Sequence, residues 1–485
     1  MRRKIYDKML DWKNNSNGKT ALLIDGARRV GKSYIAKEFA EKNYRSYILI
    51  DFNKVPDEIK NLFNNYLDNL EDFFMYLTNY YNIKLYERQS VIIFDEVQLF
   101  PRARSAIKYL VEDGRYDYIE TGSLVSIKEN VQDILIPSEE RHLKLYPFDF
   151  EEFLWALGNE NLMDVIKKCF DEKKSIDNII HRKAMDYFRK YMIVGGMPQV
   201  IQEFLLSNDF NRVDEIKQDI LNLYRDDIKK HSGKYSLKVE EIFDNIPGQL
   251  SKHEKKFNIT SLNKDAKNRD YGDAFLWLND AMIVNMAYKS TEPSVGLRLN
   301  EDSSSYKCYM ADTGLLISLA FNDNSISKEE VYKNILFDKL EFNAGMLIEN
   351  VVSQMLVTNG HRLYFYSNNS NEADDRMEID FLISKSKVTK KHNISAIEVK
   401  SGKNYTTVSL NKLYNKYTSM LDTSYIIHTG NYMVKNDIVY LPIYMTPLLW
   451  LLSWQLLYFK PLIMQVMNSQ LLKKITKEAR KCFLF

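Results

Sequence analysis

The chain has 485 residues and a formal net charge of +2, and 45% of its residues are hydrophobic and 27% charged. Single hydrophobic cores stop growing at about 250 to 300 residues, so this length predicts several domains, and we expect three. The composition is that of a globular protein and excludes a disordered or collagen-like chain. Because the net charge is small, it excludes a general attraction to nucleic acid, and any such binding requires a local basic patch.

The cysteines and the N-terminus indicate a cytoplasmic protein. Cys169, Cys308 and Cys482 lie far apart without paired spacing, which favours neither a zinc site nor a disulfide framework and indicates a reducing compartment. The N-terminal stretch MRRKIYDKMLDWKNN contains no apolar run before a small-residue cleavage site, so it is not a secretory signal.

Residues 1–150 are predicted to form an α/β domain with a parallel sheet. Apolar runs typical of strands alternate here with longer amphipathic stretches, and the runs are ALLIDG, RSYILIDF, SVIIFDEVQ, YDYIETGS and RHLKLYPF. Strands separated by helical patterns indicate a parallel sheet with crossover helices.

A glycine-bounded loop follows the first run and leads into a helical pattern. Its sequence, Gly26-Ala27-Arg28-Arg29-Val30-Gly31-Lys32-Ser33, fits the P-loop, in which backbone N–H groups and a helix N-terminus surround phosphates. Lys32 is predicted to reach the β- and γ-phosphates of ATP and Ser33 to bind Mg²⁺, and Tyr34 belongs to the same nucleotide-binding segment. For Arg28 and Arg29 the alternative is contact with solvent or with a carboxylate.

The run SVIIFDEVQ contains the adjacent carboxylates Asp95 and Glu96. Ligands of open α/β sheets bind at the carboxyl ends of the strands, so Asp95 is predicted to hold the metal through water and Glu96 to deprotonate the attacking water. The alternative is a surface acidic pair after a core strand. The run YILIDF, between the two motifs, is consistent with the P-loop NTPase class that has an inserted strand and a catalytic glutamate.

Three further polar residues are candidates for contact with the nucleotide. Thr121 or Ser123, at the end of the next run, is predicted to sense the γ-phosphate. Arg141 offers a cation to a nucleotide in its own or a neighbouring subunit, since positive charge at the transferring phosphoryl group accelerates hydrolysis. A surface salt bridge is the alternative role for Arg141.

Residues 151–335 are predicted to form a helical domain with a winged helix at about 237–315. The helical segments LKVEEIFDNIPGQLS, ITSLNKDAK and DYGDAFLWLNDA precede the strand MIVNMAYK. Basic residues in excess of acidic ones suit contacts with DNA phosphates, and they are Lys252, Lys255, Lys256, Lys264, Lys267 and Arg269. The alternatives are a protein-interaction or structural module and a solvated charged face.

Residues 336–445 are predicted to form a third, α/β module with a restriction-endonuclease-like arrangement. A helical stretch precedes the strand candidates RLYFYS, EIDFLIS and SAIEVKSG, and residues 384–393 are expected to form a solvated hairpin tip. Asp380 and Glu398, with Glu349 on the helix, are predicted to coordinate a second Mg²⁺, and Lys400 to activate the hydroxide that attacks a phosphodiester. Strand alternation places Glu398 and Lys400 on one face. The alternative is a relic in which these charges pair with one another.

Residues 446–485 form an apolar tail whose role the sequence does not define. The uncharged segment 438–459 is long enough to span a bilayer as a helix, but Pro442 and Pro447 count against a single helix. A strand followed by a buried or interfacial helix is favoured, and a membrane anchor is the alternative.

Together these segments resemble a known family, the bacterial and archaeal AAA-class ATPases with a C-terminal domain of uncharacterised function. The resemblance covers about residues 18–445 and rests on GARRVGKS, IIFDEVQ, TGS, RHLKLYPFDFEEFL, YMIVGGMPQVI, NIPGQL, YMADTGLL, GMLIENVVSQML, EIDFL and IEVKSG. It implies an ATPase, and because AAA relatives often form rings, a homo-oligomer is one expectation. The family usually has glycine before the arginine where this chain has Glu140 before Arg141.

Three functions follow as hypotheses. The first is a Mg²⁺-dependent ATPase whose hydrolysis is coupled through the C-terminal domains to a nucleic-acid or protein partner. The second is an ATP-gated, Mg²⁺-dependent DNA nuclease. The third is an interaction protein that binds nucleotide without turnover.

Overall fold

The computed structural model describes residues 1–123, 138–252, 254–262, 264, 266–294, 296–322, 328–339, 343–384, 393–402 and 405–449. The chain divides into two compact units. The first contains residues 1–287 and 304–355, and the second contains residues 288–303 and the described residues from 356 onward. The first unit holds both the first sheet and the helical region, so the division into three domains stays a prediction. Most of the expected hairpin tip at 384–393 and the tail from 450 lie outside the described residues.

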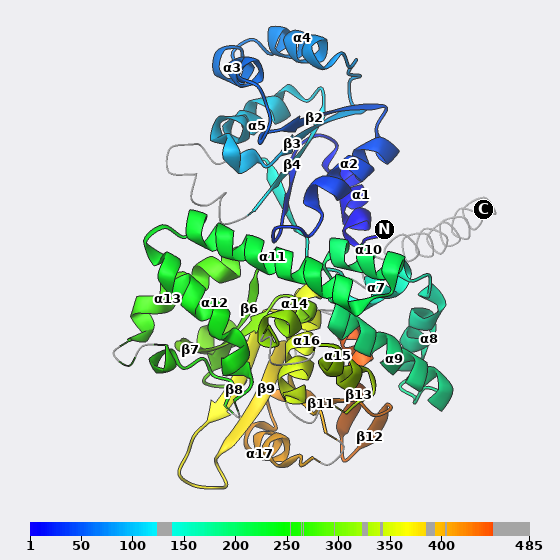
Figure 1. The fold of residues 1–485 in the computed structure, drawn as a ribbon, viewed down its shortest axis with the longest axis vertical. Coiled ribbons are helices and arrows are strands. Elements are labelled where there is room, and N and C mark those ends of the chain that lie inside the picture. Colours follow the sequence, from blue (N-terminus) through cyan, green and yellow to red (C-terminus); the bar gives the residue numbers. More distant parts are fainter. Residues whose placement is uncertain are drawn as a thin grey trace, which may run out of the picture. The chain divides into compact units, whose positions relative to one another are not determined.

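The first unit begins with a five-stranded parallel sheet of the order β2-β3-β4-β1-β5. All five predicted strands are present, and they are β1 (Ala21–Asp25), β2 (Ser46–Asp51), β3 (Ser90–Asp95), β4 (Asp117–Gly122) and β5 (Glu140–Lys144). Figure 1 shows these strands between the helices α2 (Lys32–Asn43) and α5 (Pro101–Asp113). The other helices of this region are α1 (Ile5–Ser16), α3 (Asp57–Asn65), α4 (Leu70–Tyr81) and the 3-10 turn η1 (Val97–Leu99).

The order of the sheet refines the expectation of an inserted strand. The run YILIDF forms β2, which lies at the edge of the sheet next to β3. It is β4 that lies between β1 and β3, and every residue of β1, β3 and β4 is buried. The carboxyl ends of the P-loop strand and the acidic strand are therefore separated by the carboxyl end of β4.

A mainly helical region continues the first unit. Its helices are α7 (Phe150–Ala156), α8 (Glu160–Asp171), α9 (Asn178–Val194), α10 (Pro198–Ser207), α11 (Phe210–His231), α12 (Ser236–Leu250), α13 (Asn268–Asp280), α14 (Thr313–Ala320), α15 (Lys328–Leu336) and α16 (Ala344–Thr358), the last ending in the second unit. The helix α11 packs against α10, α12 and α14. A capping box between Asp149 and Glu152 begins α7, because each side chain satisfies a backbone N–H of the other residue.

One predicted helix of the winged-helix segment differs in the structure. The segment ITSLNKDAK forms only the 3-10 turn η3 (Ile259–Ser261) among its described residues. The side chain of Asn258 accepts hydrogen bonds from the backbone N–H and the hydroxyl of Thr260, and the N–H of Phe257 bonds to the carbonyl of Tyr306. Asn258 caps the start of the turn, while Phe257 is bonded to β7 and Ser261 to Gln249 of α12, so tertiary contacts hold this segment in place of further helix bonds. The strands β6 (Val284–Ser290) and β7 (Glu301–Met310) follow, and the winged helix stays a prediction.

The second unit contains a mixed sheet. Its strands are β8 (Leu363–Asn368), β9 (Met377–Ser384), β10 (Ile394–Val399), β11 (Leu421–His428), β12 (Met433–Lys435) and β13 (Ile438–Pro442). The order is β12-β13-β11-β10-β9-β8, with β8, β9 and β10 antiparallel and with β11 parallel to β10 and β13. The helix α17 (Val408–Tyr417) packs on β9 and β11. The three strands predicted from the sequence are thus confirmed as β8, β9 and β10.

The segment 438–459 begins as predicted, with a strand. β13 ends at Pro442, and the 3-10 turn η5 (Ile443–Leu448) contains Pro447. Among the described residues, no helix has the length and apolarity that crossing a membrane requires. Residues 450–459 lie outside the described part of the chain.

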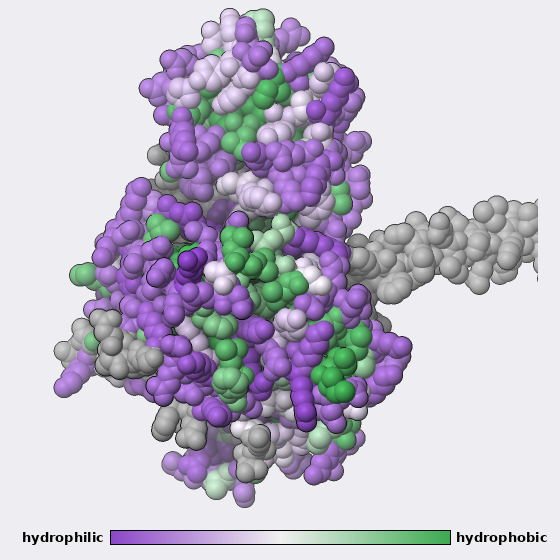
Figure 2. All heavy atoms as spheres, turned by 45° about the vertical axis from the view of Figure 1, so that its right-hand side comes forward, coloured by the Kyte–Doolittle hydropathy of each residue, from purple (hydrophilic) through white to green (hydrophobic). Residues whose placement is uncertain are grey.

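The surface in Figure 2 is mostly hydrophilic, with apolar residues in separate patches. Exposed apolar side chains include Met75, Tyr76 and Tyr80 on α4. Scattered apolar residues of this kind are normal on globular proteins and need no special explanation.

Candidate functional site: a P-loop and an acidic pair

The loop between β1 and α2 has the backbone conformation of an anion-binding nest. Arg29 and Gly31 both have positive φ angles, of 70° and 94°. Alternation with left-handed residues turns successive N–H groups to the same side, where they bind anions. Gly31 adopts this conformation without strain, whereas Arg29 carries a Cβ and is disfavoured there.

Lys32, the first residue of α2, lies inside the loop. Its Nζ donates hydrogen bonds to the carbonyl oxygens of Gly26, at 3.0 Å, and Ala27, at 3.1 Å, and the side chain is buried. Burial lowers the pKa of Lys32, while the nearby carboxylates Glu96 and Asp95 act to raise it. The predicted phosphate-binding lysine and the predicted acidic pair therefore lie close enough to influence one another electrostatically.

The other residues of the loop differ in how far their side chains are exposed. Arg28 is exposed and forms an ion pair with Asp227 of α11, so it contacts a carboxylate in this structure. Arg29 and Tyr34 are exposed, while Ala27 and Val30 are buried and Ser33 is half-buried at the second position of α2.

The acidic pair at the end of β3 is held by neutral donors. Thr121, at the end of β4, donates its hydroxyl hydrogen bond to Asp95 and accepts one from the N–H of Glu96 at 3.2 Å. The Nε2 of Gln98 donates to Oε2 of Glu96 at 2.5 Å. Glu96 has a φ of 55°, a left-handed conformation that is uncommon outside glycine and is concentrated at functional sites. The hydroxyl of Thr121 thus connects β4 to both carboxylate residues.

Of the remaining nucleotide candidates, Ser123 follows β4 and is half-buried, and Arg141 is exposed on β5. Glu140 stands where the resembled family has glycine, and its buried side chain forms a two-point ion pair with Arg104 at 2.9 and 2.8 Å. The departure from the family pattern therefore has a structural use in packing α5 against β5.

The predicted second Mg²⁺ site is divided between the two units. Glu349 lies in the first unit, where it is buried and contacts the ammonium groups of Lys255 and Lys307 and the hydroxyl of Tyr309. Burial acts to raise the pKa of Glu349, but Lys307 and Lys255 lower it to about 2. Its negative charge is neutralised inside the fold.

The other three residues of that site lie in the second unit. The Nζ of Lys400 lies 3.0 Å from Oε2 of Glu398, and the N–H of Val399 donates to Oδ2 of Asp380 at 2.8 Å. Burial raises the pKa of Glu398 and Lys400 lowers it. Burial is the larger effect, and the resulting pKa is about 7. Among the described residues, no group of three or more histidine, cysteine, aspartate and glutamate side chains is arranged to hold a metal ion. The second Mg²⁺ site stays a prediction.

One of the six residues of the predicted basic patch is engaged in an ion pair and is only partly exposed. Lys255 forms the ion pair with Glu349, and its side chain is only 17% exposed. The other five are exposed, and they are Lys252, Lys256, Lys264, Lys267 and Arg269.

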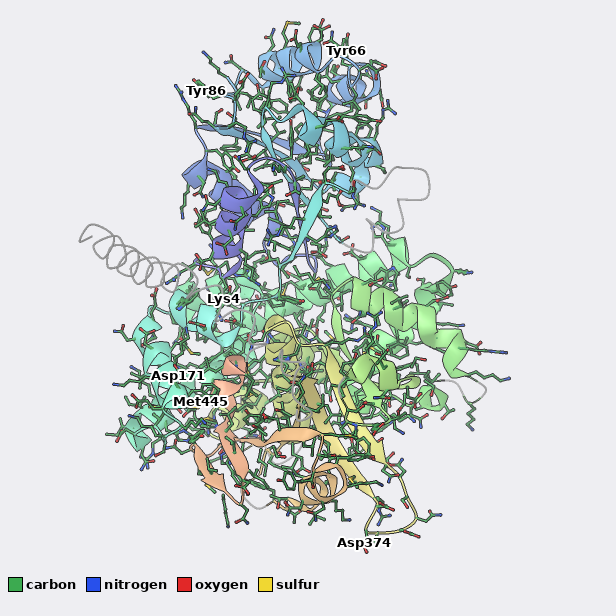
Figure 3. The ribbon with its side chains drawn as sticks, turned by 180° about the vertical axis from the view of Figure 1, so that it is seen from behind. Lys4, Tyr66, Tyr86, Asp171, Asp374 and Met445 are labelled. Carbon is green, nitrogen blue, oxygen red and sulfur yellow. The ribbon has the colours of Figure 1, made fainter. Side chains whose placement is uncertain are left out.

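The sequence did not point to three residues that support the P-loop: Arg3, Tyr224 and Asp227. Arg3 donates to the carbonyl of Val30 and Tyr224 to that of Arg28. Lys4, labelled in Figure 3, forms ion pairs with Asp149 at 2.5 Å and Glu151 at 2.8 Å. No local pattern marks such residues, because their contacts join distant parts of the chain.

Comparison with known families agrees with this geometry. A model of an AAA domain matches residues 18–154, a domain of unknown function (DUF8612) matches residues 185–326, and another (DUF4143) matches residues 344–446. The AAA match covers the P-loop, the acidic pair and all five strands of the parallel sheet. The first region therefore has an α/β P-loop fold that matches the AAA domain, and helical and mixed-sheet α/β regions follow it, as predicted at this level from the sequence.

Solved structures give only distant matches, each at 10% identity. The Aeropyrum pernix ORC1 protein in complex with DNA matches over 66% of this chain and 92% of its own, with a TM-score of 0.27. AMPPCP-bound DnaA from Aquifex aeolicus matches over 58% of this chain and 86% of its own, with a TM-score of 0.22. A DNA replication initiation factor matches over 57% of this chain and 76% of its own, with a TM-score of 0.20. Scores this low carry no functional weight. Among curated proteins, no significant match was found.

Proposed function

We propose that the protein binds ATP at the loop between β1 and α2 and hydrolyses it with the acidic pair of β3. The observation that supports this most directly is the position of the Lys32 ammonium group inside the loop that follows β1, with the acidic pair at the end of β3 separated from β1 by only one strand of the sheet. A P-loop lysine and a strand-end acidic pair are the two parts that ATP hydrolysis of this class requires.

The residues present fit a nucleotide with its magnesium ion. The nest at Arg29 and Gly31 suits phosphate oxygens, and Lys32 supplies a cation. Mg²⁺ is usually bound through one or two protein oxygens together with phosphates and waters, a set that Ser33 and Asp95 can complete. When bound, the ion neutralises the charge that develops on the phosphates.

Each side chain then has a distinct task. Lys32 holds the β- and γ-phosphates, and Glu96 orients a water molecule and removes its proton. Gln98 fixes the Glu96 carboxylate, and Thr121 fixes Asp95. Because Thr121 contacts both carboxylate residues, we infer that it senses the γ-phosphate.

The test compares two lysines of α2. Lys32→Ala is expected to abolish binding of a fluorescent ATP analogue and phosphate release, whereas Lys37→Ala, which changes an exposed lysine of the same helix, is expected to leave both unchanged. Tight binding and normal turnover by Lys32→Ala would show that the loop is not the nucleotide site.

We also propose that hydrolysis is coupled to nucleic acid through the exposed basic residues between 252 and 269. Phosphate contacts of this kind weaken steeply with salt. The rate of ATP hydrolysis is expected to rise when single- or double-stranded DNA is added at low salt, and the simultaneous change Lys264→Ala, Lys267→Ala and Arg269→Ala is expected to reduce that rise. An unchanged rate with either DNA would favour a protein partner.

A second candidate function is DNA cleavage in the second unit. The pairing of β9 with β10 brings Asp380 to the backbone of Val399, between Glu398 and Lys400. This cluster suits Mg²⁺-dependent attack on a phosphodiester. Cleavage of DNA with Mg²⁺ by the unaltered chain, lost in Lys400→Ala, is the expected result, and equal or absent cleavage in both would rule it out.

A further inference from the structure

Two buried side chains hold the outer side of the P-loop backbone. The hydroxyl of Tyr224, on α11, donates to the carbonyl oxygen of Arg28 at 3.2 Å. The Nη1 of Arg3 donates to the carbonyl oxygen of Val30 at 3.3 Å. Tyr224 is 2% exposed and Arg3 is 7% exposed, so water does not compete freely for either hydrogen bond.

These bonds determine where the next N–H groups point. In a trans peptide, the carbonyl of one residue and the N–H of the following residue point in opposite directions, and the described chain has no cis peptide bond. The two donors hold the carbonyls of Arg28 and Val30 on one side of the loop. The N–H groups of Arg29 and Gly31 therefore point to the other side of the loop. Arg29 and Gly31 are the two loop residues with positive φ.

Both supporting side chains are themselves firmly placed. One turn after Tyr224, Asp227 forms the ion pair with Arg28, which fixes α11 against the loop.

Arg3 is held at four points. Besides Val30, it donates through Nε to Glu152 at 3.2 Å and through Nη2 to the carbonyl of Tyr146 at 2.6 Å. Its guanidinium also lies 4.0 Å from the centre of the Phe148 ring. A planar guanidinium with several fixed donors is better suited to such a role than an ammonium group.

We propose that Tyr224 and Arg3 are positioning residues for nucleotide binding, which preset the N–H groups of Arg29 and Gly31 toward the phosphates. This proposal rests on the proposed function of the P-loop. The loop reaches its binding conformation before the nucleotide arrives, although Arg29 disfavours that conformation. Phosphates contact these N–H groups both before and during hydrolysis, so the two residues act on affinity and not on the rate of the chemical step.

The test uses changes that remove single donors. Tyr224→Phe deletes one hydroxyl, and Tyr332→Phe is its control, since Tyr332 is a buried tyrosine of the same unit whose hydroxyl bonds to Asp214. Arg3→Met deletes the guanidinium, Arg3→Lys restores only a charge, and Arg2→Met changes an exposed neighbour. Dissociation constants are measured for Mg-ATP and for tripolyphosphate, which carries the phosphates alone, together with kcat and KM for ATP.

Tyr224→Phe is expected to weaken binding of both ligands by about 5- to 10-fold, the effect of one lost hydrogen bond, with kcat within about twofold of the unaltered chain. Hydrogen exchange of the loop amides is expected to accelerate. Arg3→Met is expected to weaken ligand binding and accelerate exchange in the same way, and Arg3→Lys is expected to restore them only in part. The controls Tyr332→Phe and Arg2→Met are expected to change neither ligand affinity nor exchange.

Affinity and exchange in Tyr224→Phe that match the unaltered chain would overturn the inference while leaving the proposed function intact. A fall in kcat without a change in affinity would also overturn it. If the unaltered chain binds neither ligand, the proposed function fails, and the inference fails with it.

Discussion

The carboxylates at the end of β3 and those of the predicted second Mg²⁺ site follow similar sequence patterns but lie in different surroundings. Asp95 and Glu96 accept hydrogen bonds from the neutral groups of Thr121 and Gln98. Neutral donors fix the orientation of a carboxylate and leave its charge available to a cation or a proton. This is the state that a catalytic pair requires.

Glu349 and Glu398 instead have lysines of their own units as partners. Glu349 lies between Lys255 and Lys307, and Glu398 contacts Lys400. A buried ion pair of this kind is strongly destabilised when one partner is removed, because the other charge is left without compensation. The comparison teaches that carboxylates in similar sequence patterns can have neutral partners in one region and lysines in another, a difference that the motif alone does not reveal.

The largest expected effect concerns the structural use of Glu349. Lys255→Met is expected to lower the free energy of unfolding by about 3 kcal/mol, because it leaves a buried charge partly uncompensated. Lys256→Met, which changes an exposed neighbour, is expected to cost less than about 0.5 kcal/mol. Urea denaturation measures both. Equal stability of the two variants would remove the contrast and restore Glu349 as a candidate metal ligand.

The raised pKa of Glu398 predicts a dependence of stability on pH. Its pKa is about 7 in the folded protein, against an ordinary value of 4.5. Between these values the folded state holds more protons than the unfolded state, so the free energy of unfolding falls as pH rises, by about 3 kcal/mol in total.

Glu398→Gln is expected to remove this contribution, so that the variant gains stability relative to the unaltered chain between pH 5 and pH 8. Denaturation curves in the presence of EDTA, which excludes metal binding, measure the difference. Parallel pH profiles for both proteins would show that Glu398 does not titrate in this range.

A smaller effect is expected at the first site. Thr121→Val removes the hydroxyl that contacts Asp95 and the N–H of Glu96. Loss of a hydrogen bond to a charged group corresponds to about 1.5 kcal/mol, so ATP turnover is expected to fall by about 10-fold. Thr121→Ser keeps the hydroxyl and is expected to retain most of the activity. If Thr121→Val hydrolyses ATP at the normal rate, neutral support of the acidic pair has no role in catalysis.

The sequence predicted the parts of the fold that depend on local pattern. Buried strands are recognisable as apolar runs, and the P-loop and the acidic pair follow directly from such runs. The five strands of the first sheet and β8, β9 and β10 were predicted in this way. The second helix of the winged-helix segment was predicted but does not form, since its described residues contain only the short turn η3.

Contacts between distant residues could not be predicted. Tyr224 reaches the loop from 196 residues away, and Lys255 reaches Glu349 across 94 residues. Neither pair has a periodicity or spacing that a single sequence reveals. The residue types of both carboxylate groups were therefore evident, whereas the partners that distinguish them were not.

Phosphate release from Mg-ATP by Glu96→Gln tests the central claim most directly. The amide keeps the size of the side chain but cannot accept a proton, so turnover is expected to fall by at least about 100-fold while ATP binding is retained. Lys400→Ala, measured in parallel, is expected to hydrolyse ATP at the normal rate. Undiminished turnover by Glu96→Gln would contradict the assignment of the acidic pair of β3 as the hydrolytic site.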